Sequence, residues 1–152
     1  MNAIELLTND HEKVKKLLED ISNTTERAVK KRTDLLKKIA LELEVHTTLE
    51  EEIFYPAFKK AGSRDELQMF HEAKEEHRAV ESLVLPDLLK TDPGTVEFAG
   101  RVKVMKELLE HHIEEEEQEM FKNAEQLMSA QELTELGKQM EEKKSKLMKN
   151  AA

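Results

Sequence analysis

The chain has 152 residues, of which 38% are hydrophobic and 38% are charged, and its formal net charge is −9. This length suits a single domain that buries roughly two thirds of its unfolded surface. The absence of Cys excludes a disulfide framework, a Cys-ligated zinc site and a thiolate-bound iron–sulfur cluster, and the dispersed acidic charge argues against nucleic acid as a partner.

The N-terminus and the apolar runs carry no targeting or membrane signal. Residues 1–14, MNAIELLTNDHEKV, lack a basic region followed by an apolar one. No apolar run approaches the roughly 18 residues that a membrane span requires. We therefore expect a soluble, cytoplasmic protein with no membrane partner.

Helical periodicity, with only four Gly and three Pro, predicts an all-α protein. Runs of Val, Ile and aromatic residues of the kind found in strands are missing. The expected helices cover, in chain order, residues 2–23, 26–61, 64–90, 95–127 and 130–149.

Short polar segments separate these helices. We expect Gly62 to stop the second helix and residues 63–66 to begin the third as a capping box, in which Ser and Glu satisfy free amides. Residues 91–94, TDPG, predict a turn, and residues 129–132 predict another capping box. Pro56 lies inside the second helix, where we expect it to kink the helix or to end it early.

Short connections make consecutive long helices antiparallel neighbours. Residues 1–128 are therefore predicted to form an up-down-up-down four-helix bundle. Residues 129–152 are predicted to form an additional C-terminal helix that packs on the bundle or on a partner subunit. Its apolar stripe consists of Leu133, Leu136, Met140 and Leu147.

An internal repeat relates the two halves of the chain with an offset of 66 residues. HTTLEEEIFYP at 46–56 lies over HIEEEEQEMFK at 112–122, and the same offset carries His11 to His77. Each half therefore has a His and, 35 residues later, a His-x-x-x-Glu motif. The apolar positions follow the repeat as well. The sequence thus predicts two similar helical hairpins that face each other.

The repeat predicts a metal site inside the bundle. Residues at i and i+4 share a helix face, so His46 with Glu50, and His112 with Glu116, each present an imidazole and a carboxylate to one place. Burial of unpaired carboxylates is costly, and a cation would remove the cost. With His11 and His77, this set suits two metal ions, and its donor types suit iron, manganese or zinc.

His71 and His111 do not obey the repeat. His111 lies about 100° around the helix from His112 and overlies Val45, so we expect it to sit at a helix contact and to tune the site. Tyr55 overlies Phe121 and is expected in the core, with a possible role around the site. Glu114, Glu115 and Glu117 are expected on a solvated face.

Between about residues 4 and 125 the sequence resembles the hemerythrin family, the HHE cation-binding domain. The resemblance is carried by His, His-x-x-x-Glu, His and His-x-x-x-Glu on four successive helices, and by the motif ends EEEIFYP and EEQEMFK. It implies a non-haem di-iron centre in a four-helix bundle, with two iron ions (Fe2+/Fe3+) and a bridging oxo or hydroxo group. Its implied ligands are His11, His46, Glu50, His77, His112 and Glu116, with the two glutamates as bridges.

The sequence departs from the oxygen-carrying members of that family. Those proteins have an additional His one turn from the third-helix ligand, where this chain has Ala73 and Glu81. They also place the fourth-helix carboxylate five residues after its His, a spacing that fits His111 with Glu116. Glu81 is a candidate for the missing ligand. Ferritin-like di-metal bundles are excluded, because no His here has a Glu three residues before it.

Three classes of function stay open from the sequence. The resemblance implies binding of O2 or a related small diatomic or peroxide ligand. An enzyme would be a di-iron oxidoreductase that decomposes peroxide or reduces nitric oxide, and an iron-handling protein would store or sense iron. We expect a monomer or a homodimer.

Overall fold

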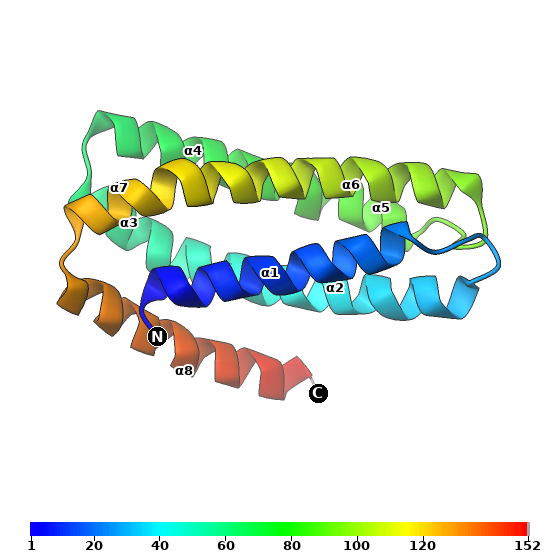
Figure 1. Ribbon diagram of the computed structural model, residues 1–152, viewed down its shortest axis with the longest axis horizontal. Helices are drawn as coiled ribbons and strands as arrows, with labels where there is room; N and C mark the ends of the chain where they lie inside the picture. Colours follow the sequence, from blue (N-terminus) through cyan, green and yellow to red (C-terminus); the bar gives the residue numbers. More distant parts are fainter. Residues whose placement is uncertain (152) are drawn as a thin grey trace.

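The computed structural model describes residues 1–151, and within that range all of the regular secondary structure is helical, with no strand. Four rods, each of them one helix or a run of consecutive helices, lie side by side, and a fifth helix lies along one side of them (Figure 1). This arrangement confirms the predicted all-α fold. None of the helices within the described range is both long and apolar enough to cross a bilayer.

The rods follow the predicted segments closely. The first is α1 (Ala3–Ser22). The second joins α2 (Val29–Leu49), the π-helical turn η1 (Glu50–Phe54) and α3 (Tyr55–Ala61). The third joins α4 (Arg64–Ala79), η2 (Val80–Val84) and α5 (Leu85–Leu89). The fourth joins α6 (Val96–Glu115), η3 (Glu116–Met120) and α7 (Phe121–Leu127), and the fifth is α8 (Ala130–Ala151).

The structure refines two sequence expectations. The second rod begins at Val29 and not near residue 26, because Ala28 still donates its amide to Thr25 in a turn. Pro56 does not end the helix, which continues to Ala61. Instead the backbone forms η1 directly before it, and such a turn adds one residue to the usual helical repeat.

The helix ends are closed largely as predicted. The Ser63 amide donates to Glu66 Oε1 over 2.8 Å, which completes the expected capping box. At the start of α8 the Glu132 amide donates to Ser129 Oγ over 3.1 Å.

Two apolar clusters fill the bundle, one toward each end. The first contains Leu7, Phe54 and Phe58. The second contains Leu18 and Ile39. On α1, for example, the first cluster ends at Leu7 and the second begins at Val14, so a layer of other side chains separates them. That layer holds the buried histidines and glutamates.

Helix α8 packs on its own bundle. Leu133 and Met140 are buried in the first apolar cluster, and the helix lies along α1 and α2 (Figure 1). At Gly137 a Cβ atom would collide with the backbone of Met1 and Asn2, so a glycine is required for this close approach. The C-terminal helix is therefore held against the first half of the chain.

Candidate metal centre

Each of the four bundle rods contributes one histidine to the layer between the apolar clusters. His11 lies on α1, His46 on α2, His77 on α4 and His112 on α6. All four are buried, with at most 5% of each residue exposed. The structure thus brings the four repeat-related histidines together.

Glu50 and Glu116 each begin a π-helical turn one helical turn after a histidine. The Tyr55 amide donates to the carbonyl of Glu50, and the Phe121 amide donates to the carbonyl of Glu116. These five-residue hydrogen bonds replace the usual four-residue ones, and π-helical turns of this kind are frequent at functional sites. Each wide turn is closed by an aromatic residue, Tyr55 or Phe121, that lies five residues after its glutamate.

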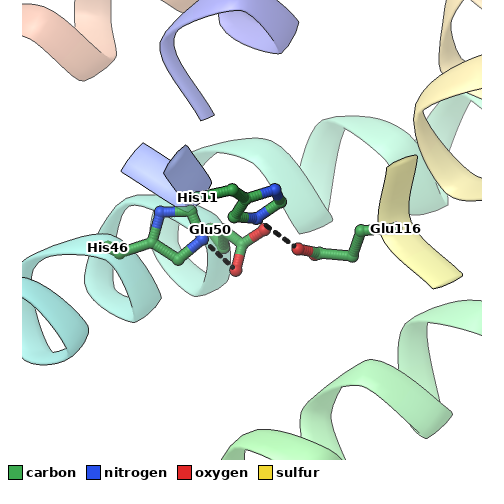
Figure 2. Close-up of side chains that lie close together, drawn as sticks. All are labelled: His11, His46, Glu50 and Glu116. Carbon is green, nitrogen blue, oxygen red and sulfur yellow. Dashed lines mark hydrogen bonds and ion pairs between the residues drawn. The ribbon is translucent and has the colours of Figure 1, made fainter. Parts of the chain in front are cut away.

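The two glutamates lie among the histidines. Glu50 Oε1 is 3.1 Å from His46 Nε2 and 3.1 Å from His77 Nε2. Glu116 Oε1 is 3.1 Å from His11 Nε2 and 3.4 Å from His112 Nε2. Figure 2 shows His11, His46, Glu50 and Glu116 pointing toward one another from three different rods.

The donor atoms form two groups that share Glu50. One group consists of His11, His46, Glu50 and Glu116, and the other of Glu50, His77 and His112. Within each group the possible ligand atoms lie within 4.8 Å of one another. A shared carboxylate between two sets of imidazoles is suited to two adjacent cations.

Within the part of the chain that the structure describes, three buried atoms at the centre lack a hydrogen-bond partner. They are His46 Nε2 and both carboxylate oxygens of Glu50. The 3.1 Å approach of His46 Nε2 to Glu50 brings charges together, but the two groups are not aligned as donor and acceptor. Buried polar atoms are nearly always satisfied, so these atoms fit a metal as their missing partner. The residues present therefore suit a cation held by imidazole and carboxylate.

A second layer of carboxylates lies behind the histidines. His11 Nδ1 is 2.6 Å from Glu117, and His77 Nδ1 is 2.9 Å from Glu51. His46 Nδ1 is 3.0 Å from Asp10, and His112 Nδ1 is 2.8 Å from Glu76. A carboxylate on Nδ1 takes the N–H and leaves Nε2 free to bind metal.

This second layer was not predicted. Glu117 was expected on a solvated face, and only part of its side chain is exposed because it reaches back to His11. The repeat could have revealed the layer, since the offset of 66 residues relates Asp10 to Glu76 and Glu51 to Glu117. Each of the four directly precedes a repeated His or directly follows a repeated Glu.

The charges of the layer stabilise one another. Burial lowers the pKa of His77, but the carboxylates of Glu50 and Glu51 outweigh it and raise that pKa to about 10. Burial raises the pKa of Glu50, but the charge of His46, with His77 close by, outweighs it and holds that pKa well below its usual range. Metal binding by such groups displaces the imidazole protons, so the cation takes over the neutralising role.

Two aromatic rings close the centre on the side of the first apolar cluster. The Tyr55 ring stacks on His77 with centroids 5.5 Å apart, and the Phe121 ring stacks on His11 with centroids 5.6 Å apart. The Tyr55 hydroxyl donates to Glu116 Oε2 over 2.6 Å and lies 3.2 Å from His77 Nε2. Tyr55 is thus in the core, as predicted, but its hydroxyl reaches the donor atoms.

The remaining candidates lie outside the two groups. Glu81 accepts a hydrogen bond from the Thr47 hydroxyl and does not join either group. The His111 side chain is 63% exposed and lies 3.0 Å from Glu115 and 3.7 Å from Glu76. His71 is exposed.

A small pocket leads from the surface to Glu116. Its volume is about 20 Å³, and its lining includes Met69, Ala73, Glu76 and Met120 besides Glu116. This is room for a molecule of roughly the size of water. The access that it offers therefore suits a small ligand and not an organic substrate.

Comparison with known proteins gives a consistent result. Residues 2–124 match the family described as Hemerythrin HHE cation binding domain. A crystal structure of a hemerythrin HHE cation binding domain-containing protein from Mycobacterium kansasii superposes with a TM-score of 0.85 at 28% sequence identity, over 99% of this chain and 90% of that one. A protein from Nostoc sp. named DNA nickase is 24% identical over 148 residues, which are 97% of this chain. The chain spans only 40% of the length of that relative.

Proposed function

This chain belongs to the hemerythrin HHE cation-binding family, and we propose that it holds two non-haem iron ions and binds O2 or a related small diatomic or peroxide ligand. The observation that carries the proposal is the set of unpartnered buried atoms, His46 Nε2 and both oxygens of Glu50, at the meeting point of two donor groups. A dry core does not keep such atoms without a partner.

The chain's own residues suggest how the metals would be held. His11 and His46 would bind one ion, and His77 and His112 the other. Glu50 and Glu116 would also hold the ions, because each lies close to a histidine of both halves. When bound, a pair of iron ions supplies electrons and an open coordination position for a small ligand.

The surrounding side chains would keep the centre ordered and poor in water. Phe54, Phe121 and Met120 lie on one side and Leu109 and Met105 on the other, all buried. The four outer carboxylates hold the imidazoles in one orientation, with Nε2 directed to the centre. The ligand would reach this centre through the small pocket at Glu116.

Decomposition of peroxide is a second candidate function, and Tyr55 favours it. Burial, followed by the charges of Glu116 and Glu50, raises the pKa of the Tyr55 hydroxyl well above its usual value, so the phenol keeps its proton. The hydroxyl oxygen lies 2.6 Å from Glu116 Oε2 and donates that proton to it, within the centre. A proton donor at this place suits the turnover of a reduced oxygen species more than simple carriage.

The name of the Nostoc relative does not by itself extend to this chain. That protein is much longer, and the shared part covers 40% of it. A net charge of −9 also disfavours contact with phosphate backbones.

Metal analysis of anaerobically purified protein, followed by optical spectra on addition of O2 and then peroxide, tests the proposal. Two irons per chain with a stable, reversible spectral change on O2 would support ligand binding. Two irons with no stable change on O2 but rapid gas evolution from peroxide would support the enzyme. A chain purified with zinc, or without stoichiometric metal, would contradict the iron proposal.

A further inference from the structure

The C-terminal helix reaches the metal centre through one lysine. Lys144 of α8 lies with its Nζ 2.5 Å from Asp10 Oδ1. The other oxygen of the same carboxylate, Asp10 Oδ2, lies 3.0 Å from His46 Nδ1. A continuous chain of contacts therefore joins α8, a helix outside the repeated bundle, to one of the central histidines.

Asp10 differs from the other three outer carboxylates in its surroundings. Only 4% of its side chain is exposed, whereas the side chains of Glu51, Glu76 and Glu117 are 34%, 28% and 24% exposed. Water can therefore solvate the other three, but Asp10 depends on protein partners. A buried carboxylate with a single partner is costly, and Lys144 supplies the second partner and the opposite charge.

The repeat supplies an internal reference for this contact. Asp10 and Glu76 occupy equivalent positions, and each accepts from the Nδ1 of a central histidine. Glu76 has no lysine partner among the described residues and instead lies near His111, at 3.7 Å. The lysine contact is therefore a feature of one half only, and α8 provides it because it packs on α1, α2 and η1.

We infer that Lys144 is a positioning residue of the centre, which fixes Asp10 and through it His46, so that α8 sets the affinity of the metal position formed by His11 and His46. The inference rests on the proposed function, because it requires two metals in the centre. The position formed by His77 and His112 lacks this control. Helix α8 would thus make the two otherwise similar positions unequal.

The test starts from the full chain loaded anaerobically with Fe2+ and challenged with graded concentrations of an Fe2+ chelator, with iron per chain as the readout. Lys144→Met keeps most of the apolar stem and removes the charge. We expect this variant to release one of the two irons at about tenfold lower chelator concentration. Loss of a group that orients a metal-binding histidine lowers metal affinity by about 10- to 100-fold, and the expected effect is at the lower end of that range. The second iron should be released as in the unchanged chain.

Lys143→Met is the matched control. Lys143 is the preceding residue on α8 and pairs with exposed Glu52 at 3.6 Å, away from the centre. It should release both irons as the unchanged chain does. Lys144→Arg keeps the charge and should restore most of the affinity. Lys144→Met added to Asp10→Asn should cause no further loss, since the lysine acts through Asp10.

The outcomes separate the inference from the proposed function. An unchanged chain that holds fewer than two irons contradicts the proposed function before any variant is compared, and the inference falls with it. If the unchanged chain holds two irons, several results would overturn the inference alone. One is that Lys144→Met releases both irons at the unchanged chelator concentration, or shifts the release of both irons equally. Others are that Lys143→Met causes a similar shift, that Lys144→Arg fails to restore the affinity, or that the losses of Lys144→Met and Asp10→Asn add.

Discussion

The two halves of the chain, residues 3–61 and 64–127, present the same donors to the centre but differ in what surrounds them. Both supply a His and a His-x-x-x-Glu, and both supply two outer carboxylates at the same offset. The first half carries Tyr55 where the second carries Phe121, and α8 packs on the first half through α1, α2 and η1. The repeat therefore sets the type of site, and the unrepeated residues set how its two positions differ.

We predict that Glu50 and Glu116 are needed for metal binding by both donor groups at once. We expect Glu50→Ala combined with Glu116→Ala to abolish metal loading, because both donor groups lose carboxylate oxygens. Glu114→Ala, at an exposed position two residues before Glu116, should load metal normally. Metal analysis of the purified variants gives the answer, and stoichiometric metal in the double variant would contradict the assignment.

Tyr55 and Phe121 offer a way to make the two halves more alike. If the protein decomposes peroxide, Tyr55→Phe should lower the rate by roughly 10²-fold, the scale of a lost proton donor. Iron content should stay near that of the unchanged chain, because no donor atom of either group is removed. Gas evolution from peroxide, measured per bound iron, checks this. An unchanged rate would leave Tyr55 with a packing role.

The equivalent outer carboxylates Asp10 and Glu76 sharpen the comparison further. Asp10→Asn and Glu76→Gln should each weaken metal binding, by about 10- to 100-fold, since each frees an imidazole to turn. We expect the larger loss for Asp10→Asn, because it also leaves Lys144 without its partner beside a buried position. Chelator competition on both variants measures the difference. A larger loss of metal affinity in Glu76→Gln than in Asp10→Asn would contradict the proposal that the first half depends more strongly on its outer carboxylate.

The smallest expected effect concerns the packing of α8 against the first half of the chain. Gly137→Ala should lower the free energy of unfolding by about 1–3 kcal/mol, because the added Cβ meets backbone atoms that cannot move aside alone. Gly100→Ala is the control, since a Cβ there meets nothing within 4 Å on helix α6 and should add up to about 1 kcal/mol of helix stability. Urea unfolding measures the free energy of unfolding of both variants. Equal values would mean that α8 packs only loosely against the first half.

The sequence by itself determined the helices and the inner donors. Helical spacing places His46 with Glu50, and His112 with Glu116, on shared faces, and the 66-residue repeat selects His112 over the exposed His111. The predicted helix bounds differ from the observed ones by at most three residues. These features depend on local periodicity, which can be recognised from the order of residues alone.

Only the tertiary structure decided what lies behind the donors. Glu117 reaches His11 across 106 residues of sequence, and Lys144 reaches Asp10 across 134. Spacing along one helix cannot predict such contacts, because they depend on which neighbouring rod comes close and on how far a long side chain extends. Helical spacing does not predict the π-helical turns either, because each adds one residue to a helical turn; directly after η1, the Tyr55 hydroxyl donates to Glu116 on another rod.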